Sequence, residues 1–288
     1  MGTGGGFGCK STSTMKLDLH THTTASDGVL SPSELVGFAK AANLDALAIT
    51  DHDTVAGLDE ALKAGLKHSI QIIPGIEVSC SASGIPCHIL GYFIDHQSSM
   101  LTEYTTKAIH AREDRMNEML SRLASQDVFV DIEDVIEEAG PDRSSLGRPH
   151  LARALVSKNY ASSIGDAFNR LIGDGHPAQV SIRVLEAHEA IGLIRKAGGI
   201  AVWAHPRLEV LEELLPELVI AGLRGLEVYR PKSSPEHVQK VKESAEKMDL
   251  LVTGGSDWHG PGLGAELGKF YVTAGDISQF LSEGQMST

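Results

Sequence analysis

Residues 16–50 read KLDLHTHTTASDGVLSPSELVGFAKAANLDALAIT and contain a predicted strand, a helix and a second strand in direct succession. The segments 16–20 and 46–50 are short apolar runs of the β type. Between them, residues 31–34 (SPSE) place a capping serine, a proline at the first helical position and a glutamate three residues after the cap. This pattern predicts a helix that runs to about Asn43. A strand, a helix and a strand in this order are typical of a parallel βαβ unit.

The same alternation of strands and helices extends over most of the chain. Further strands are predicted at residues 70–74, 88–93, 199–204, 226–229, 251–253 and 270–273, with later helices at 186–196 and 236–248. Seven or eight strands, most of them followed by a helix, predict an α/β fold with a closed or nearly closed (β/α) barrel. Between residues 98 and 184 the sequence gives helical stretches, including 101–123 and 148–156, with no convincing strand. We therefore expect three parts: a flexible leader (1–14), a barrel (15–97 and 185–288) and a helical insertion that acts as a lid (98–184).

Composition excludes several classes of protein. The 288 residues are 42% hydrophobic and 22% charged, which is typical of a globular chain. No apolar run approaches the roughly 18 residues that a membrane span needs. The 38 acidic and 25 basic side chains leave a net charge of −13, which argues against stable binding of duplex nucleic acid or anionic lipid. Three cysteines cannot form a full disulfide framework, so a reducing cytoplasm is the predicted location.

Histidines and carboxylates gather where the predicted strands end. His20 and His22 are two residues apart, so in extended chain their rings point the same way. A single motif of this kind is more often a surface or capping feature than a metal site, but six separate segments with such residues at equivalent strand ends are not explained in that way. Because the carboxyl ends of parallel barrel strands share one face, we expect these side chains to converge. The candidate metal ligands are His20, His22, Asp27, His52, Glu77, His88, His205, Asp257 and His259.

The donor atoms narrow the choice of metal. Imidazole nitrogens and carboxylate oxygens without thiolates suit Mn, Fe, Zn or Co better than Mg or Ca. Nine candidates exceed the coordination number of one ion, so we expect two or three divalent metals, with Glu77 as a bridging ligand. Such ions bind anionic oxygens and turn water into hydroxide near neutral pH. The metal ions would supply the local positive charge that an anionic substrate needs and that a protein with a net charge of −13 otherwise lacks.

Six motifs together resemble the PHP (polymerase and histidinol phosphatase) metallophosphoesterases. They are DLHTH at 18–22, DG at 27–28, ITDHD at 49–53, PGIE at 74–77, AHP at 204–206 and GSDWH at 255–259. The resemblance implies a distorted (β/α)7 barrel with a three-metal centre, with manganese favoured and iron or zinc as alternatives. The insertion and the GRPH motif at 147–150 are most similar to the branch of nucleoside 3′,5′-bisphosphate phosphatases and 5′-3′ RNA exonucleases.

The resemblance also implies roles for individual residues. It assigns one ion to His20, His22, Glu77 and Asp257, a second to Glu77, His88 and His205, and a third to Asp27, His52 and His259. Arg148 resembles a phosphate-binding arginine, and Arg207 is a candidate for a second. Asp27 or His259 would assist proton transfer, which makes Asp27, His259 and Arg148 the candidate catalytic residues. His150 lies two residues beyond Arg148 and either faces the same pocket or stays outside it.

The function implied by the resemblance is hydrolysis of phosphomonoesters by a metal-bridging hydroxide. The expected substrates are small and phosphorylated: the 3′-phosphate of a nucleoside 3′,5′-bisphosphate, or the 5′-end of a short RNA. One alternative is a small-metabolite phosphatase of the histidinol phosphate type. Others are an amidohydrolase that attacks C–N or C–O bonds in a similar barrel, and a PHP interaction module without catalysis.

Overall fold

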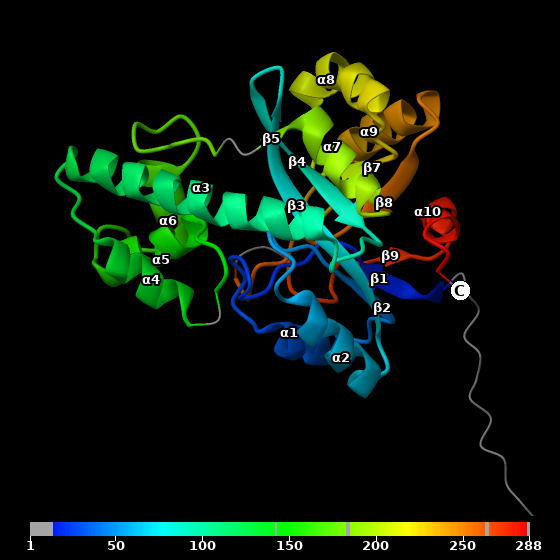
Figure 1. Cartoon of the computed structure of the whole chain (residues 1–288), viewed down its shortest axis with the longest axis horizontal. Helices are drawn as coiled ribbons and strands as arrows, with labels where there is room; N and C mark the ends of the chain where they lie inside the picture. Colours follow the sequence, from blue (N-terminus) through cyan, green and yellow to red (C-terminus); the bar gives the residue numbers. More distant parts are fainter. Residues whose placement is uncertain (1–13, 142, 183–184, 263–264, 287–288) are drawn as a thin grey trace, which may run out of the picture.

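A computed structural model describes residues 14–141, 143–182, 185–262 and 265–286. Apart from Thr14, the predicted leader lies outside the described residues. Within them, a nine-stranded sheet curls into a nearly closed barrel that helices surround (Figure 1). The predicted α/β fold, a distorted (β/α)7 barrel with a helical insertion, is confirmed.

Strands occur at every predicted position. They are β1 (Lys16–Asp18), β2 (Ala46–Ile49), β3 (Gln71–Ala82), β4 (Ile85–Tyr92), β5 (Leu185–Glu186), β6 (Ile200–Trp203), β7 (Gly225–Tyr229), β8 (Leu251–Gly254) and β9 (Val272–Thr273). The helices are α1 (Pro32–Ala41), α2 (Leu58–His68), α3 (Ser99–Ala124), α4 (Ile132–Ala139), α5 (Arg148–Ser157), α6 (Ile164–Ala167), a π-helical turn (Phe168–Ile172), α7 (Ala187–Lys196), α8 (Leu208–Ala221), α9 (Pro235–Lys247) and α10 (Ser278–Glu283). The predicted cap of α1 is present, because the Ser31 hydroxyl accepts from Glu34 N and the Glu34 carboxylate accepts from Ser31 N.

β4 departs from the expected parallel arrangement. The sheet order is β8-β7-β6-β4-β3-β2-β1-β9, and β4 runs antiparallel to both β3 and β6. The cause is a tight hairpin at Ser83 and Gly84, whose φ angles of 49° and 78° reverse the chain after β3. The start of β4 therefore lies at the barrel end where the parallel strands finish. This reversal brings His88 to that end.

The barrel closes between β1 and β8. Leu19 N donates to Gly254 O at 3.3 Å, and Thr21 forms a parallel bridge with Trp258 just beyond both strands. β9 pairs antiparallel with the first residues of β1, where Lys16 lies opposite Thr273 and Leu17 opposite Val272. The ends of β1 and β8, which carry predicted ligands, are thus held side by side.

Two hydrophobic layers flank the sheet, as β2 illustrates. Leu47 and Ile49 belong to the layer under the helices, whereas Ala46 and Ala48 belong to the cluster in the barrel interior. Phe280 of α10 closes that interior against Tyr92, with ring centroids 5.1 Å apart. The apolar interior fills one end of the barrel and leaves the opposite end to polar side chains.

The insertion lies beside the barrel and has its own apolar cluster. The long helix α3 starts next to β3 and β4 and runs away from the barrel over α4, α5 and α6 (Figure 1). The cluster is formed by side chains between Met116 and Ala178, all from this segment. None of the helices in the described residues has the length and apolar character that crossing a membrane requires.

Candidate metal centre

The carboxylate of Glu77 lies at the centre of the site. It comes from the middle of β3, and its side chain is 1% exposed. Five histidine rings surround it. Its Oε2 is 3.1 Å from His20 Nε2, 3.3 Å from His22 Nε2 and 3.2 Å from His52 Nδ1, and its Oε1 is 2.8 Å from His88 Nδ1 and 3.0 Å from His205 Nε2.

The nine predicted ligands all lie at this end of the barrel, in overlapping groups. The groups whose ligand atoms lie within 4.8 Å of one another are His20, His22, Glu77 and Asp257; His22, Asp27, His52 and His259; and His52, Glu77 and His88. The first group has the predicted composition. The second adds His22 to the predicted set, and the third contains His52 where His205 was expected. His205 lies beside this third group, with its Nε2 3.2 Å from His88 Nδ1.

Unpartnered buried nitrogens show that the residues fit metal ions. The His22 side chain is fully buried, yet neither of its ring nitrogens makes a well-oriented hydrogen bond, although its Nε2 lies 3.3 Å from Glu77 Oε2. The Nδ1 atom of His52 is also buried and makes no well-oriented hydrogen bond, although it lies 3.2 Å from the same carboxylate oxygen. Because a buried polar atom without a partner costs free energy, such nitrogens indicate a missing ligand. Divalent cations would satisfy these atoms.

The pKa shifts of the histidines and of Glu77 also support binding of cations at this site. Burial lowers the pKa of His52 to about 3, so its ring is neutral and has a lone pair for a metal. Burial also acts to lower the pKa of His22, but the carboxylates of Asp257 and Glu77 raise it to about 10. Burial would raise the pKa of Glu77, but His52, His20 and His88 hold it well below its usual value. The carboxylates therefore favour positive charge where the histidine rings meet.

Strained backbone accompanies the ligands. His205 and Asp257 have φ angles of 34° and 56°, and Asp53, next to His52, has 55°. Residues other than glycine rarely adopt this conformation, and it persists where the surrounding structure enforces it, often at functional sites. At His205 the enforcing contact is visible, because its backbone N–H donates to Glu227 Oε2 at 2.8 Å.

Sequence reasoning missed two buried acids that support the ligands. Glu227 Oε1 lies 2.9 Å from His20 Nδ1, so this carboxylate orients the ring whose other nitrogen faces Glu77. Burial raises the pKa of Asp18 to about 6, and its carboxylate accepts from Ser256 N at 2.8 Å. The sequence feature that could have identified these two residues is an acidic side chain within an apolar strand: Asp18 lies in β1 and Glu227 lies in β7.

A second missed group ties the insertion to the ligand loops. Arg112 of α3 donates through Nε to Asp53 Oδ2 at 2.8 Å, and both side chains are buried. The same carboxylate accepts from the Tyr104 hydroxyl and from Ser79 N. Burial would raise the pKa of Asp53, but the Arg112 guanidinium holds it below its usual value. α3 is therefore anchored one residue from His52.

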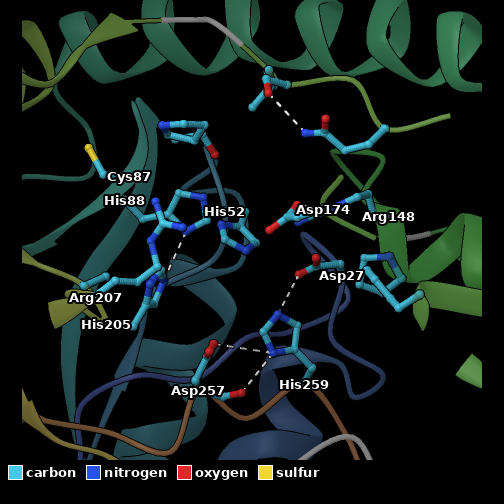
Figure 2. A pocket seen from close by; sticks show the side chains of 18 of the residues that line it. Asp27, His52, Cys87, His88, Arg148, Asp174, His205, Arg207, Asp257 and His259 are labelled. Carbon is cyan, nitrogen blue, oxygen red and sulfur yellow. Dashed lines mark hydrogen bonds and ion pairs between the residues drawn. The ribbon is translucent and has the colours of Figure 1, made fainter. Parts of the chain in front are cut away.

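The two predicted phosphate-binding arginines line a cavity of about 990 Å³ above the ligands. Figure 2 shows Arg207 beside His205 and His88 on one side, and Arg148 near Asp174 and Asp27 on the other. Arg148 begins α5, as predicted, and its Nη1 lies 2.7 Å from the exposed carboxylate of Asp174. An anion that enters the cavity would compete with Asp174 for this guanidinium.

His150 caps a helix and is not among the residues that line the cavity. Its Nδ1 accepts from Gly147 N at 3.0 Å at the start of α5, and the residue is 1% exposed. Burial lowers its pKa to about 4. The ring must be neutral at Nδ1 to accept this hydrogen bond.

Folding stability should therefore depend on the protonation of His150. Because its pKa is lower in the folded than in the unfolded state, the unfolded chain binds the proton more strongly. The free energy of unfolding should fall as pH decreases from 6.5 to about 4, by at most about 3 kcal/mol from this residue. Urea unfolding of His150→Asn, which keeps an acceptor, should show a weaker pH dependence than the parent over this window. Equal slopes for the two proteins would refute the assignment.

Comparisons with known proteins agree with this geometry. The family described as PHP domain matches residues 18–197. The chain is 36% identical to a 5′-3′ exoribonuclease of Haemophilus influenzae, over 89% of this chain and 94% of that protein. It is 32% identical to a 3′,5′-nucleoside bisphosphate phosphatase of Chromobacterium violaceum, over 86% of this chain and 88% of that one. A crystal structure from Bifidobacterium adolescentis, described as a metal-dependent phosphoesterase, superimposes with a TM-score of 0.86 at 32% identity and covers 93% of this chain and 96% of its own.

The fold, the cluster of ligands and these similarities define a metal-dependent phosphoesterase. The chain belongs to the PHP family. The predictions of a hydrolase and of a phosphoesterase of this family are confirmed.

Proposed function

We propose that the protein hydrolyses the 3′-phosphate of nucleoside 3′,5′-bisphosphates or removes nucleotides from the 5′-ends of short RNA. The observation that carries this proposal is the juxtaposition of Glu77 and the eight other candidate ligands with a cavity lined by arginines. The similarity to proteins with these two activities supports the choice of substrate. The size of the cavity suits a nucleotide, because small-molecule sites measure roughly 300–1,000 Å³.

The proposal includes two or three divalent ions, with manganese favoured over iron or zinc. The groups described above would hold them, with His205 completing the group of His52, Glu77 and His88. Bound ions would supply charge stabilisation and an activated water at neutral pH. A mixed set of imidazole and carboxylate donors without thiolate suits these metals.

The remaining roles fall to protein side chains. Arg148 and Arg207 would bind phosphate oxygens from opposite sides of the cavity, since a guanidinium matches phosphate through paired hydrogen bonds. His259 Nε2 lies 3.4 Å from Asp27 Oδ1, so these two residues can pass a proton to a leaving oxygen. The insertion (98–184) would act as the lid, because Arg148 and Gln179 belong to it and line the cavity. A cytoplasmic location, based on cysteine content, remains part of the proposal.

The test is phosphate release from a panel of compounds with added manganese. We expect turnover of adenosine 3′,5′-bisphosphate or of short 5′-phosphorylated RNA, and little turnover of histidinol phosphate. Preference for histidinol phosphate would instead favour the small-metabolite alternative. No turnover of any compound, together with no bound metal by elemental analysis, would favour the interaction module.

A further inference from the structure

Two cysteine side chains face each other across the β3–β4 hairpin. Cys80 of β3 lies directly opposite Cys87 of β4 in the antiparallel register. Their Sγ atoms are 3.5 Å apart, and both thiols are free. The two residues are buried, with exposed fractions of 3% and 7%. Their sulfur atoms are therefore in contact but not bonded, an arrangement that the proposed hydrolysis does not use.

The backbone geometry at this position fits a disulfide. Directly opposite residues of an antiparallel pair have Cα atoms roughly 4.5–5.5 Å apart. Disulfides join Cα atoms that are roughly 4.4–6.8 Å apart, with a sulfur–sulfur bond of about 2 Å. The tight hairpin already holds the two strands in register, so little chain entropy opposes closure. Forming the bond requires rotation of the thiols and a small shift of the strands toward each other.

The thiols can be reached from the cavity. Both cysteines are among the residues that line it, and Figure 2 shows Cys87 beside His88 at its edge. The hydrogen bond with Cys87, followed by burial, raises the pKa of the Cys80 thiol well above its usual value. Because the thiolate is the reactive form, Cys80 is the poorer first nucleophile. A small oxidant that enters the cavity should therefore react with Cys87 first.

The neighbouring pair of residues in the hairpin belongs to the candidate metal centre. His88 directly follows Cys87 and is paired with Ser79, and its Nδ1 lies 2.8 Å from Glu77 Oε1. Successive side chains of a strand point to opposite faces. The two thiols accordingly lie in the apolar layer under the helices and belong to none of the ligand groups found in the described residues. A change in strand separation at the cysteines would move His88 relative to Glu77.

We propose that Cys80 and Cys87 form a redox-sensitive modification site, at which hydrogen peroxide produces a disulfide that lowers the activity of the adjacent metal centre. Formation of the disulfide is independent of the proposed function, whereas its effect on activity rests on that function.

The oxidation proceeds in two steps. The Cys87 sulfur attacks one oxygen of the peroxide, the O–O bond breaks, and a sulfenic acid and water form. The Cys80 sulfur then attacks the Cys87 sulfur, the S–O bond breaks, and the disulfide and a second water form. Two thiols are oxidised by the loss of two electrons and two protons, and one peroxide is reduced to two waters.

Mass spectrometry of the full chain, incubated with manganese, tests the site. The substitution Cys9→Ser is introduced in every sample, because Cys9 is the third cysteine of the sequence. After treatment with peroxide and then an alkylating reagent, the tryptic peptide 68–107, which contains both remaining cysteines, should be unalkylated and lighter by two hydrogens. A phosphine reductant should restore both alkylation sites. Alkylated or overoxidised cysteines without the disulfide would overturn the inference.

The effect on activity is measured with the same samples. Peroxide should lower kcat/KM for adenosine 3′,5′-bisphosphate by about 10- to 100-fold, the loss typical when groups that orient a metal ligand are disturbed. The reductant should restore the parent value. Cys80→Ser keeps a donor for the Cys87 carbonyl, which Cys80 Sγ contacts at 3.3 Å, but cannot form the disulfide, so it should resist peroxide. Cys87→Ser is the second variant and should resist equally.

The mass measurement separates this inference from the proposed function. If the disulfide forms and the reduced protein hydrolyses no nucleotide, the proposed function fails and the modification site stands. If the reduced protein hydrolyses nucleotides but no disulfide forms, only this inference fails. An equal loss of activity in the parent and in both serine variants, or a disulfide that leaves activity unchanged, would refute the regulatory effect.

Discussion

Replacing Glu77 with glutamine is expected to lower kcat/KM for the phosphorylated substrate by at least about 1,000-fold, since metal ions supply several kcal/mol of charge stabilisation. Glutamine has the same shape but no charge, so the variant tests the carboxylate and not the packing. Glu77 belongs to two of the three groups of candidate ligands and contacts five histidines. Its loss should release at least one ion per chain, which elemental analysis of the purified variant will show.

The control for this variant is Glu236→Gln. Glu236 lies on α9, is 74% exposed and pairs with Lys240 at the surface. The Glu236→Gln substitution removes the same charge at a position away from the ligand end of the barrel. The metal content and the activity of this variant should therefore match those of the parent. If Glu77→Gln keeps the full metal content and activity within tenfold of the parent, the metal centre assigned here is wrong.

The convergence of the candidate metal ligands could be predicted from the sequence because their arrangement is set by local rules. His20 and His22 follow a strand with the spacing that points two side chains the same way, and Asp257 and His259 repeat it after β8. Strand ends of a barrel meet at one face, so short motifs were sufficient to predict convergence. His88 is the exception, since its place depends on the β3–β4 hairpin, and the parallel sheet expected from the sequence did not include that reversal.

The residues that sequence reasoning missed depend on contacts between distant parts of the chain. Glu227 is one acid in an apolar strand, and its partner His20 is 207 positions away. Arg112 lies in a polar stretch of α3 that resembles a solvated helix face. Its burial follows from the packing of the insertion against the barrel, which no local periodicity encodes. Contacts between the insertion and the barrel were therefore harder to predict than the candidate metal ligands.

The anchoring of α3 leads to the largest expected effect on stability. Replacing Arg112 with alanine leaves the carboxylate of Asp53 buried without its cation, and breaking a buried ion pair in this way costs about 3–5 kcal/mol. Arg112 also donates to Ser79 Oγ at 3.0 Å, so the variant loosens α3 from β3 as well. Urea unfolding at pH 7 will measure the change in the free energy of unfolding. Lys107→Ala, on an exposed part of the same helix, should change it by less than about 1 kcal/mol.

A double-mutant cycle shows whether charge or packing is responsible. In an Asp53→Asn background no anion is left unpaired, so Arg112→Ala should cost at least about 1 kcal/mol less than in the parent, within the range of coupling energies for contacting residues. An equal cost in both backgrounds would mean that Arg112 acts through packing alone. Because Asp53 follows His52 directly, loss of the pair should also lower metal content, whereas a purely packing role predicts a destabilised protein that still holds its ions when folded. Elemental analysis at low temperature, where the variant remains folded, distinguishes the two.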